Sequence, residues 1–165
     1  MTIQIDSREK QFDHIKEQLD QAGVKHFVSK LPVGDYMSLD HPRLMIDRKK
    51  NLQELCTNLC QQHDRFRREL ERAQNLDIRL IFLVEHSRNI RTLSDVRHWN
   101  NPRLAVSPYA LDGPGLYQRL VTIENRYGTT FYFCAKRETG NRIIELLQHG
   151  GKPYHINIGK KEVTT

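Results

Sequence analysis

Hydrophobic positions in the first half of the chain switch between the spacing of strands and that of helices. Ile3 and Ile5 alternate with polar residues and predict a strand that ends at Asp6. Apolar residues then recur at helical spacing over residues 12–22, and Gly23 lies where such a helix would end. Three further strands are predicted, over residues 26–31, 36–39 and 44–49.

The second half of the chain continues this alternation. Two helices are predicted over residues 52–60 and about 64–76. The segment from Arg79 to Val84 follows, and its continuous apolar run from Leu80 is typical of a buried central strand. Residues 87–114 are the least regular. A helix, a strand and a last helix then follow, over residues 116–127, 130–134 and 143–147. The pattern predicts one α/β domain over residues 1–151, a central mixed sheet flanked by helices, with a short basic tail over residues 152–165.

Composition narrows the class of protein further. The 165 residues carry 26 Lys and Arg against 20 Asp and Glu, and this net charge of +6 suits a polyanionic partner such as DNA. No apolar run approaches the roughly 20 residues of a membrane span, and the N-terminus lacks the features of a signal peptide. Three cysteines give no disulfide framework. We therefore expect a globular protein of the cytoplasm, in a bacterial or phage-infected cell, or of another intracellular compartment, without a membrane partner.

Two carboxylates and a lysine carry the candidate chemistry. Asp35 and Asp47 lie on neighbouring predicted strands that would form a hairpin, which can bring both acids to one end of a sheet. Lys49 lies two residues after Asp47, so both side chains point to the same face, whereas Arg48 would point to the other. Two oxygen ligands and a nearby ammonium suit a divalent cation that acts on a phosphodiester, although ordinary surface charges on a solvated hairpin are the alternative for this loose pattern.

Acids at the end of the first strand strengthen the case for a metal site. Asp6 and Glu9 can lie beside the hairpin, where several clustered acids repel one another unless they bind a cation. Their alternative role is to cap the helix that follows. The basic face of the 64–76 helix has two interpretations as well: a phosphate-binding surface, or a solvated face on which arginines pair with Glu69 and Glu71.

The motifs follow one another in the order of a known family. Asp6-Ser7-Arg8-Glu9, then Val33-Gly34-Asp35-Tyr36, then Asp47-Arg48-Lys49 resemble the nuclease domain of the XPF family, and the resemblance continues through Arg65-Phe66 and Leu83-Val84-Glu85. The resemblance implies a restriction-endonuclease-like fold and metal-dependent endonuclease cleavage of branched DNA, such as a flap, fork or junction, in repair or recombination. It also implies a homodimer, built in part by the region of residues 107–113 and the helices after it.

The same resemblance implies roles for individual residues. Asp35 and Asp47 would bind Mg²⁺ or Mn²⁺, and Asp6 and Glu9 would support the metal or its water, with Asp6 counted among the metal ligands. Arg48 would contact phosphate or hold the site together, and Lys49 would act at the nucleophile or the charged transition state. The residues expected to bind nucleic acid are Arg8, Arg65, Arg68 and Arg72.

The chain departs from the family pattern at two positions. Asp47 replaces the usual glutamate with a shorter acid, and Gln53 stands where the motif has its final aspartate. Glu54 is adjacent but would point about 100° away on a helix. Two alternatives therefore stay open beside the structure-selective endonuclease. One is a catalytically weakened DNA-binding or scaffold subunit, and the other is a resolvase or recombination nuclease of a mobile element.

Overall fold

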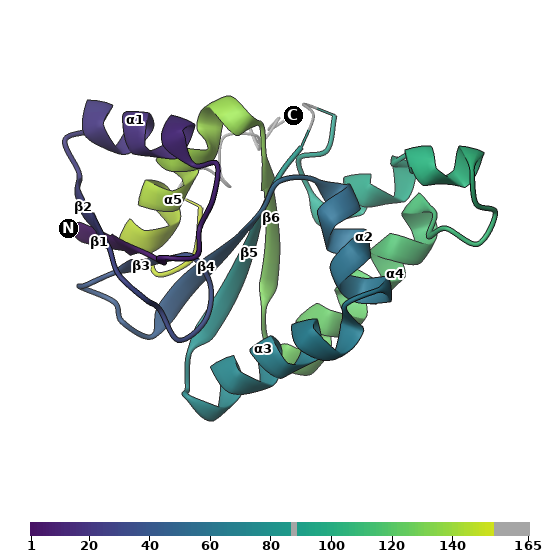
Figure 1. The fold of residues 1–165 in the computed structure, drawn as a ribbon, viewed down its shortest axis with the longest axis horizontal. Coiled ribbons are helices and arrows are strands. Elements are labelled where there is room, and N and C mark those ends of the chain that lie inside the picture. The colour runs from purple at the N-terminus through teal and green to yellow at the C-terminus, as the bar shows by residue number, and fades with distance from the viewer. Residues whose placement is uncertain (87–88, 154–165) are drawn as a thin grey trace, which may run out of the picture.

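The computed structural model describes residues 1–86 and 89–153, and six strands in this part of the chain form one sheet in the order β2-β1-β3-β4-β5-β6 (Figure 1). β1 pairs in parallel with β2 and antiparallel with β3, β3 and β4 form the predicted antiparallel hairpin, and β4, β5 and β6 are parallel. The sheet is therefore mixed, as predicted. The strands are β1 (Thr2–Ile5), β2 (Lys25–Val28), β3 (Tyr36–Ser38), β4 (Leu44–Lys49), β5 (Arg79–Glu85) and β6 (Thr130–Cys134).

Helices cover both faces of the sheet. α1 and α5 pack together on one face, and α2, α3 and α4 lie on the other (Figure 1). This arrangement confirms the predicted α/β class with a central mixed sheet flanked by helices. The α-helices are α1 (Asp13–Gln21), α2 (Leu52–Cys60), α3 (His63–Asn75), α4 (Gly113–Tyr127) and α5 (Thr139–Gln148). Three short 3-10 helices are η1 (Leu93–His98), η2 (Pro102–Ala105) and η3 (Lys136–Glu138).

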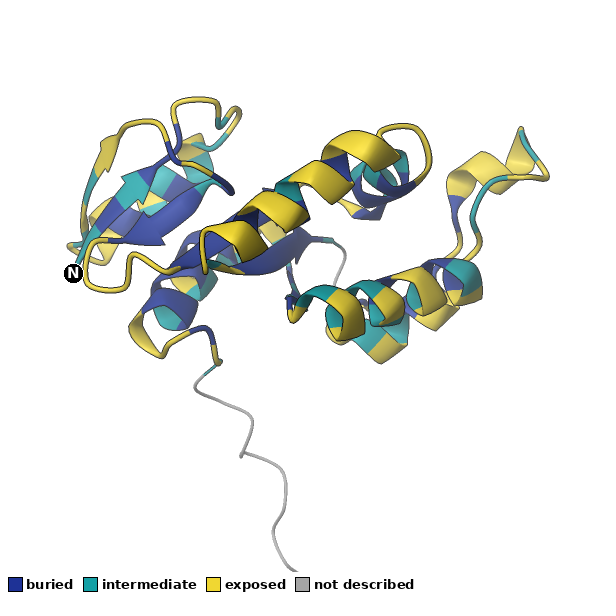
Figure 2. Ribbon diagram, turned by 90° about the horizontal axis from the view of Figure 1, so that it is seen from below, coloured by how far each residue is buried: buried dark blue, intermediate teal, exposed yellow. Residues whose placement is uncertain are grey.

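The continuous apolar run of β5 is explained by burial on both faces. Ile81 and Leu83 join the core beneath α1 and α5, whereas Leu80, Phe82 and Val84 join the core beneath α2, α3 and α4. Figure 2 shows buried residues concentrated in the strands and exposed ones on the outer sides of the helices. Because β4 pairs directly with β5, its own residues alternate between these two cores in the same register.

Some expectations about the outer parts of the fold need adjustment. β2 ends at Val28, earlier than the predicted residue 31. The irregular region includes η1 and η2, and beyond η2 Tyr109 is 95% exposed.

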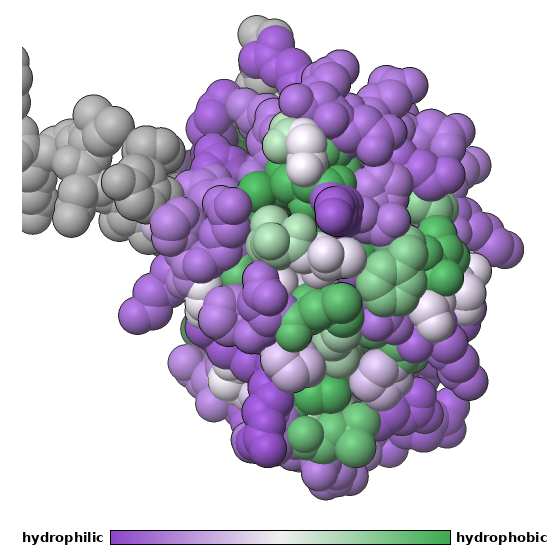
Figure 3. Space-filling view, turned by 90° about the vertical axis from the view of Figure 1, so that its left-hand side faces the viewer, coloured by the Kyte–Doolittle hydropathy of each residue, from purple (hydrophilic) through white to green (hydrophobic). Residues whose placement is uncertain are grey.

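Figure 3 shows the side of the molecule that includes the β2 edge of the sheet, where apolar residues gather among hydrophilic ones. Most of the predicted basic tail, from residue 154 onward, lies outside the described residues. Among those that are described, no helix has the length and apolarity needed to cross a membrane.

Candidate active site

The turn before β3 brings Asp35 to the ends of β1 and β4. The backbone N–H of Asp35 donates to the Ile46 carbonyl at 2.8 Å, and the Asp35 carbonyl accepts from the Asp6 N–H at 2.8 Å. Gly34 makes this turn possible because its φ of +67° lies in the left-handed region. A Cβ at Gly34 would also lie only 3.1 Å from the Ile46 carbonyl oxygen. The glycine of the motif is therefore required by backbone conformation and by close packing.

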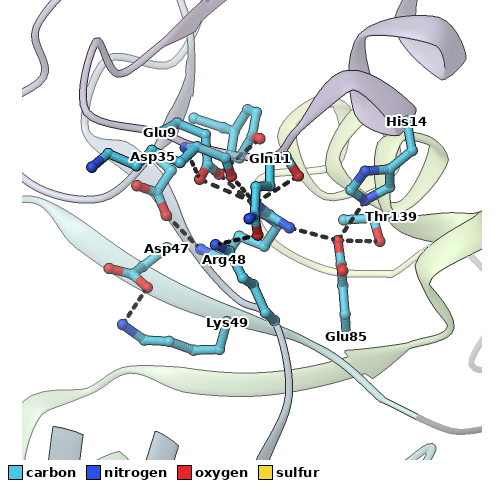
Figure 4. A network of polar contacts seen from close by, with 12 residues as sticks. Glu9, Gln11, His14, Asp35, Asp47, Arg48, Lys49, Glu85 and Thr139 are labelled. Atoms are coloured by element: carbon cyan, nitrogen blue, oxygen red, sulfur yellow. Dashed lines mark hydrogen bonds and ion pairs between the residues drawn. The ribbon is translucent and has the colours of Figure 1, made fainter. Parts of the chain in front are cut away.

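Asp35, Asp47 and Lys49 form the centre of the site (Figure 4). Asp35 Oδ2 accepts the backbone N–H of Arg48 at 2.8 Å, which ties the acid to the end of β4. The Asp47 side chain is nearly buried, and its Oδ1 lies 2.8 Å from Lys49 Nζ. Lys49 Nζ in turn lies 5.7 Å from the ring centres of Phe66 and Phe82. As predicted, Asp47 and Lys49 point to the same face of the sheet.

Burial shapes the charges of this centre. Desolvation raises the pKa of Asp47 to about 7, although the Lys49 ammonium opposes the rise. Desolvation and the neighbouring Asp47 carboxylate raise the pKa of Asp35 well above its usual value. Burial is the largest single influence on Lys49 and would lower its pKa, but the contact with Asp47 together with the charges of Glu69 and Asp35 outweighs it, so the pKa lies above the usual value. Two carboxylates are thus held where their negative charge is poorly compensated.

Asp6 differs from these two acids because its carboxylate is fully engaged. Asp6 Oδ1 accepts the Leu31 N–H at 2.7 Å, and Oδ2 accepts the Arg8 backbone N–H at 3.1 Å and Arg8 Nε at 2.7 Å. Burial would raise the pKa of Asp6, but these hydrogen bonds outweigh it and leave the pKa below its usual value. The geometry therefore favours a positioning role, in which Asp6 joins β1 to the loop before Gly34.

Glu9 and Arg48 form a buried network on the opposite face of β4 (Figure 4). The Arg48 side chain is 1% exposed, and Glu9 accepts hydrogen bonds from its Nε at 3.0 Å and Nη2 at 3.1 Å. Glu9 also accepts the Tyr36 hydroxyl at 2.9 Å. Arg48 Nη1 donates to Glu85 at 3.1 Å. Of the two roles expected for Arg48, this geometry favours holding the site together, because so buried a guanidinium does not reach a phosphate.

The network continues from Glu85 into α1 and α5. Glu85 Oε1 accepts His14 Nε2 at 2.8 Å and the Thr139 hydroxyl at 2.9 Å. The alternative that Asp6 and Glu9 cap the first helix is wrong, since α1 begins after Phe12 without a side-chain cap. Glu9 lines the hollow and its charge acts on Asp35, but both of its oxygens accept hydrogen bonds from Arg48 or Tyr36, so the geometry favours indirect support of a metal or its water.

A hollow of about 570 Å³ opens above the acids. Acidic side chains from the strand ends line it together with arginines of α3 and Arg8, so a negatively charged floor has positive neighbours. Arg67 lies elsewhere and pairs with Asp64 at 3.6 Å and Glu71 at 3.8 Å, which confirms the solvated-face alternative for this one arginine. All four residues expected to bind nucleic acid line the hollow, namely Arg8, Arg65, Arg68 and Arg72.

Sequence reasoning missed two acids of the hollow. Glu54, expected to point away, lines it from α2, and Glu69 lines it from α3. Glu69 Oε1 accepts the Gly34 N–H at 3.2 Å, so it reaches the residue directly before Asp35. The signal for Glu69 was present in the sequence, because residues 65, 69 and 72 recur at the spacing of one helix face. Gln53, in contrast, donates to Asn101 Oδ1 at 2.8 Å and does not line the hollow.

The donor set fits a hard divalent cation held by two carboxylates. Among the described residues, Asp47 Oδ1 is reached only by the Lys49 ammonium, and Asp35 Oδ1 accepts no hydrogen bond. Within residues 1–86 and 89–153, no three His, Cys, Asp or Glu side chains are arranged to hold an ion together. Mg²⁺ commonly keeps several waters and takes only one or two protein carboxylates, so Asp35 and Asp47 satisfy its requirements.

Comparisons with known proteins identify the family. A family model described as the ERCC4 domain matches residues 5–147, and the chain belongs to this family. The fold is similar to that of XPF from Aeropyrum pernix, with a TM-score of 0.66 and 18% identity over 91% of this chain and 65% of that one. A second structure, XPF from Aeropyrum pernix in complex with DNA, gives a TM-score of 0.64 and 18% identity over 90% and 64%. The chain thus spans less than two thirds of either. No curated protein sequence matches it significantly.

Proposed function

We propose that the chain is a divalent-cation-dependent endodeoxyribonuclease that hydrolyses phosphodiester bonds in branched DNA. The observation that carries this proposal is the pair Asp35 and Asp47, two poorly compensated carboxylates beside Lys49 at the floor of an arginine-lined hollow. Membership of the ERCC4-domain family supports the same activity. A role in repair or recombination follows from branched substrates and belongs to the proposal.

The residues present divide the work of hydrolysis between them. Asp35 and Asp47 would hold Mg²⁺ or Mn²⁺, which supplies charge stabilisation to phosphate oxygens and lowers the pKa of a bound water. Lys49 keeps its proton beside Asp47 and places a positive charge where negative charge develops on the phosphate. The buried network of Glu9 and Arg48 keeps the strand ends in register, so that the two acids stay together.

Arginines of α3 position the DNA backbone in this proposal. Arg65, Arg68 and Arg72 line the hollow and, within the described part of the chain, form no ion pair. Their charges are therefore available to phosphates, and contacts of this kind are salt-sensitive and independent of sequence. The complex of the similar XPF structure with DNA supports such a partner.

A panel of labelled flap, fork and four-way junction DNAs tests the activity. Purified protein with Mg²⁺ or Mn²⁺ should cut at least one of them between pH 7 and 9, and a chelator should abolish the cutting. Asp35→Asn should keep DNA binding and lose cleavage. Absence of cutting on every substrate with both metals would refute the enzymatic proposal for this chain. Preference for the four-way junction would favour the resolvase alternative.

The scaffold alternative rests on a specific observation. Gln53 carries no charge and is turned toward Asn101, so the acid expected at this position is missing. A scaffold without a working site predicts that calorimetric titration with Mn²⁺ detects no specific binding. The endonuclease predicts saturable binding that Asp35→Asn weakens.

We further propose a homodimer that uses the segment after η2. Val106 and Tyr109 expose 83% and 95% of their surface, and large exposed apolar side chains often mark contact surfaces. Sedimentation should therefore give twice the monomer mass. Tyr109→Ser with Val106→Ser should shift it to the monomer without loss of secondary structure.

A further inference from the structure

Position 53 does not supply the acid that the nuclease motif places there. Gln53 is anchored by its hydrogen bond to Asn101 Oδ1, and Asn101 in turn donates to the Leu111 carbonyl at 2.7 Å. Asn101 Oδ1 also accepts the Arg103 N–H at 3.0 Å, so the amide is held from several sides. Gln53 is committed to connecting α2 with the segment around η2.

Glu69 enters the site from a different element. It lies on α3 one helical turn from Arg65 and Arg72, on the face that lines the hollow. Its Oε1 is fixed by the Gly34 N–H at 3.2 Å, and its charge acts on both Asp47 and Lys49. The carboxylate is therefore held beside the two acids and does not belong to the solvated side of the helix, where Glu71 pairs with Arg67.

An independent observation indicates that this region receives a cation. Asp47 is only 5% exposed, and among the described residues only the Lys49 ammonium, 2.8 Å away, reaches its Oδ1. The charges of Asp35 and Glu69 act on the same ammonium, so one buried lysine serves three carboxylates. Such a group of acids is costly unless a further positive charge is supplied.

We propose that Glu69 replaces the missing acid of position 53, as the third carboxylate of the cation site, acting through water. This inference rests on the proposed function, because it assumes that Asp35 and Asp47 hold the cation. Asp35, Asp47 and Glu69 do not converge closely enough to bind an ion directly together. Glu69 is therefore a positioning residue that accepts hydrogen bonds from waters on the cation, which Mg²⁺ and Mn²⁺ sites retain.

Glu69→Gln separates this role from a purely structural one. Glutamine keeps an oxygen that can accept the Gly34 N–H but removes the negative charge. Glu71→Gln is the matched control, because it makes the same change on the same helix outside the hollow. Outer-shell partners of metal sites are commonly worth about 10- to 100-fold in affinity, so Glu69→Gln should weaken Mn²⁺ binding by about that factor.

Isothermal titration of the whole chain with Mn²⁺, without DNA, measures this effect apart from activity. We expect Glu69→Gln to weaken binding at an unchanged melting temperature, and Glu71→Gln to bind as the wild type does. A double-mutant cycle with Asp47→Asn should show that the two substitutions are not additive, because both act on one ion.

Different outcomes overturn different statements. If the wild type binds Mn²⁺ and Glu69→Gln binds it equally well, the role of Glu69 is refuted and the proposed function stands. If Gln53→Met weakens binding as much as Glu69→Gln does, position 53 serves the site and the replacement is refuted. If the wild type binds no Mn²⁺, the proposed function fails together with this inference.

Discussion

Replacing Asp47 with asparagine should stabilise the metal-free protein at alkaline pH. The native fold holds this carboxylate in a nearly buried position, where desolvation raises its pKa to about 7. In the unfolded chain the same group titrates near 3.8. Because the native state binds the proton more tightly, the protonated acid stabilises the fold at low pH. That contribution is lost as the pH rises through about 7.

The size of the effect follows from the two pKa values. Each tenfold difference in proton affinity is worth about 1.36 kcal/mol, so ionised Asp47 destabilises the native protein by about 4 kcal/mol relative to its protonated form. Asparagine resembles the protonated acid in size and charge. Asp47→Asn should therefore match the wild type near pH 4 and exceed its unfolding free energy by about 4 kcal/mol at pH 8. Asp35 contributes in the same direction, and the two acids titrate as a pair.

Urea denaturation of both proteins between pH 4 and 8, with a chelator present, measures this difference. Subtracting one pH curve from the other removes the contributions of groups that both proteins share, such as His86, whose pKa burial lowers. Addition of Mn²⁺ at pH 8 should then stabilise the wild type by mass action and leave Asp47→Asn nearly unchanged.

Parallel pH curves for the two proteins would refute the argument. They would mean that Asp47 is as well solvated in the native state as in the unfolded chain. A less stable Asp47→Asn at pH 8 would also refute it, because the ion pair with Lys49 would then outweigh the burial of the carboxylate.

Three further substitutions test other parts of the site. Arg48→Met should lower the unfolding free energy by about 3–5 kcal/mol in urea, because it takes the guanidinium away from buried Glu9 and Glu85. Arg142→Met, which removes a less buried pair, should cost under about 1 kcal/mol, and equal losses would contradict the network. Lys49→Met should abolish cleavage, yet calorimetry should show that it binds Mn²⁺ at least as tightly as the wild type, because a competing buried cation is removed. Weaker binding than the wild type would contradict this. Arg72→Ala should reduce the slope of log affinity for DNA against log salt concentration by about 0.9, and Arg67→Ala should leave the slope unchanged. Equal effects of the two substitutions would contradict the proposal that DNA binds at the hollow.

Local pattern was sufficient to predict the elements that carry the central acids. β4 has the predicted bounds, its hairpin with β3 is present, and Asp47 and Lys49 share a face opposite Arg48. These features depend on a two-residue repeat and short turns, which neighbouring residues determine. The fold class followed from the order of the same elements.

The division of labour among the acids could not be predicted in this way. Asp6 and Asp35 are both aspartates at strand ends, yet one is saturated by hydrogen bonds and the other is not. The difference arises from Arg8 and Leu31, which donate to Asp6, and the Leu31 N–H reaches that acid only in the folded chain. For the same reason, the spacing on α3 places Glu69 on the face of Arg65 and Arg72 but does not indicate its contact with Gly34.

The buried network and the site residues of β4 depend on one another. Adjacent residues of a strand point to opposite faces, so fixing Arg48 between Glu9 and Glu85 on one side also fixes Asp47 and Lys49 on the other. A rigid support of this kind can hold two repelling carboxylates together without a cation, because the strand cannot turn to separate them. The motif therefore serves two purposes on the two faces of β4: its arginine fixes the strand, and its acid and lysine form the site.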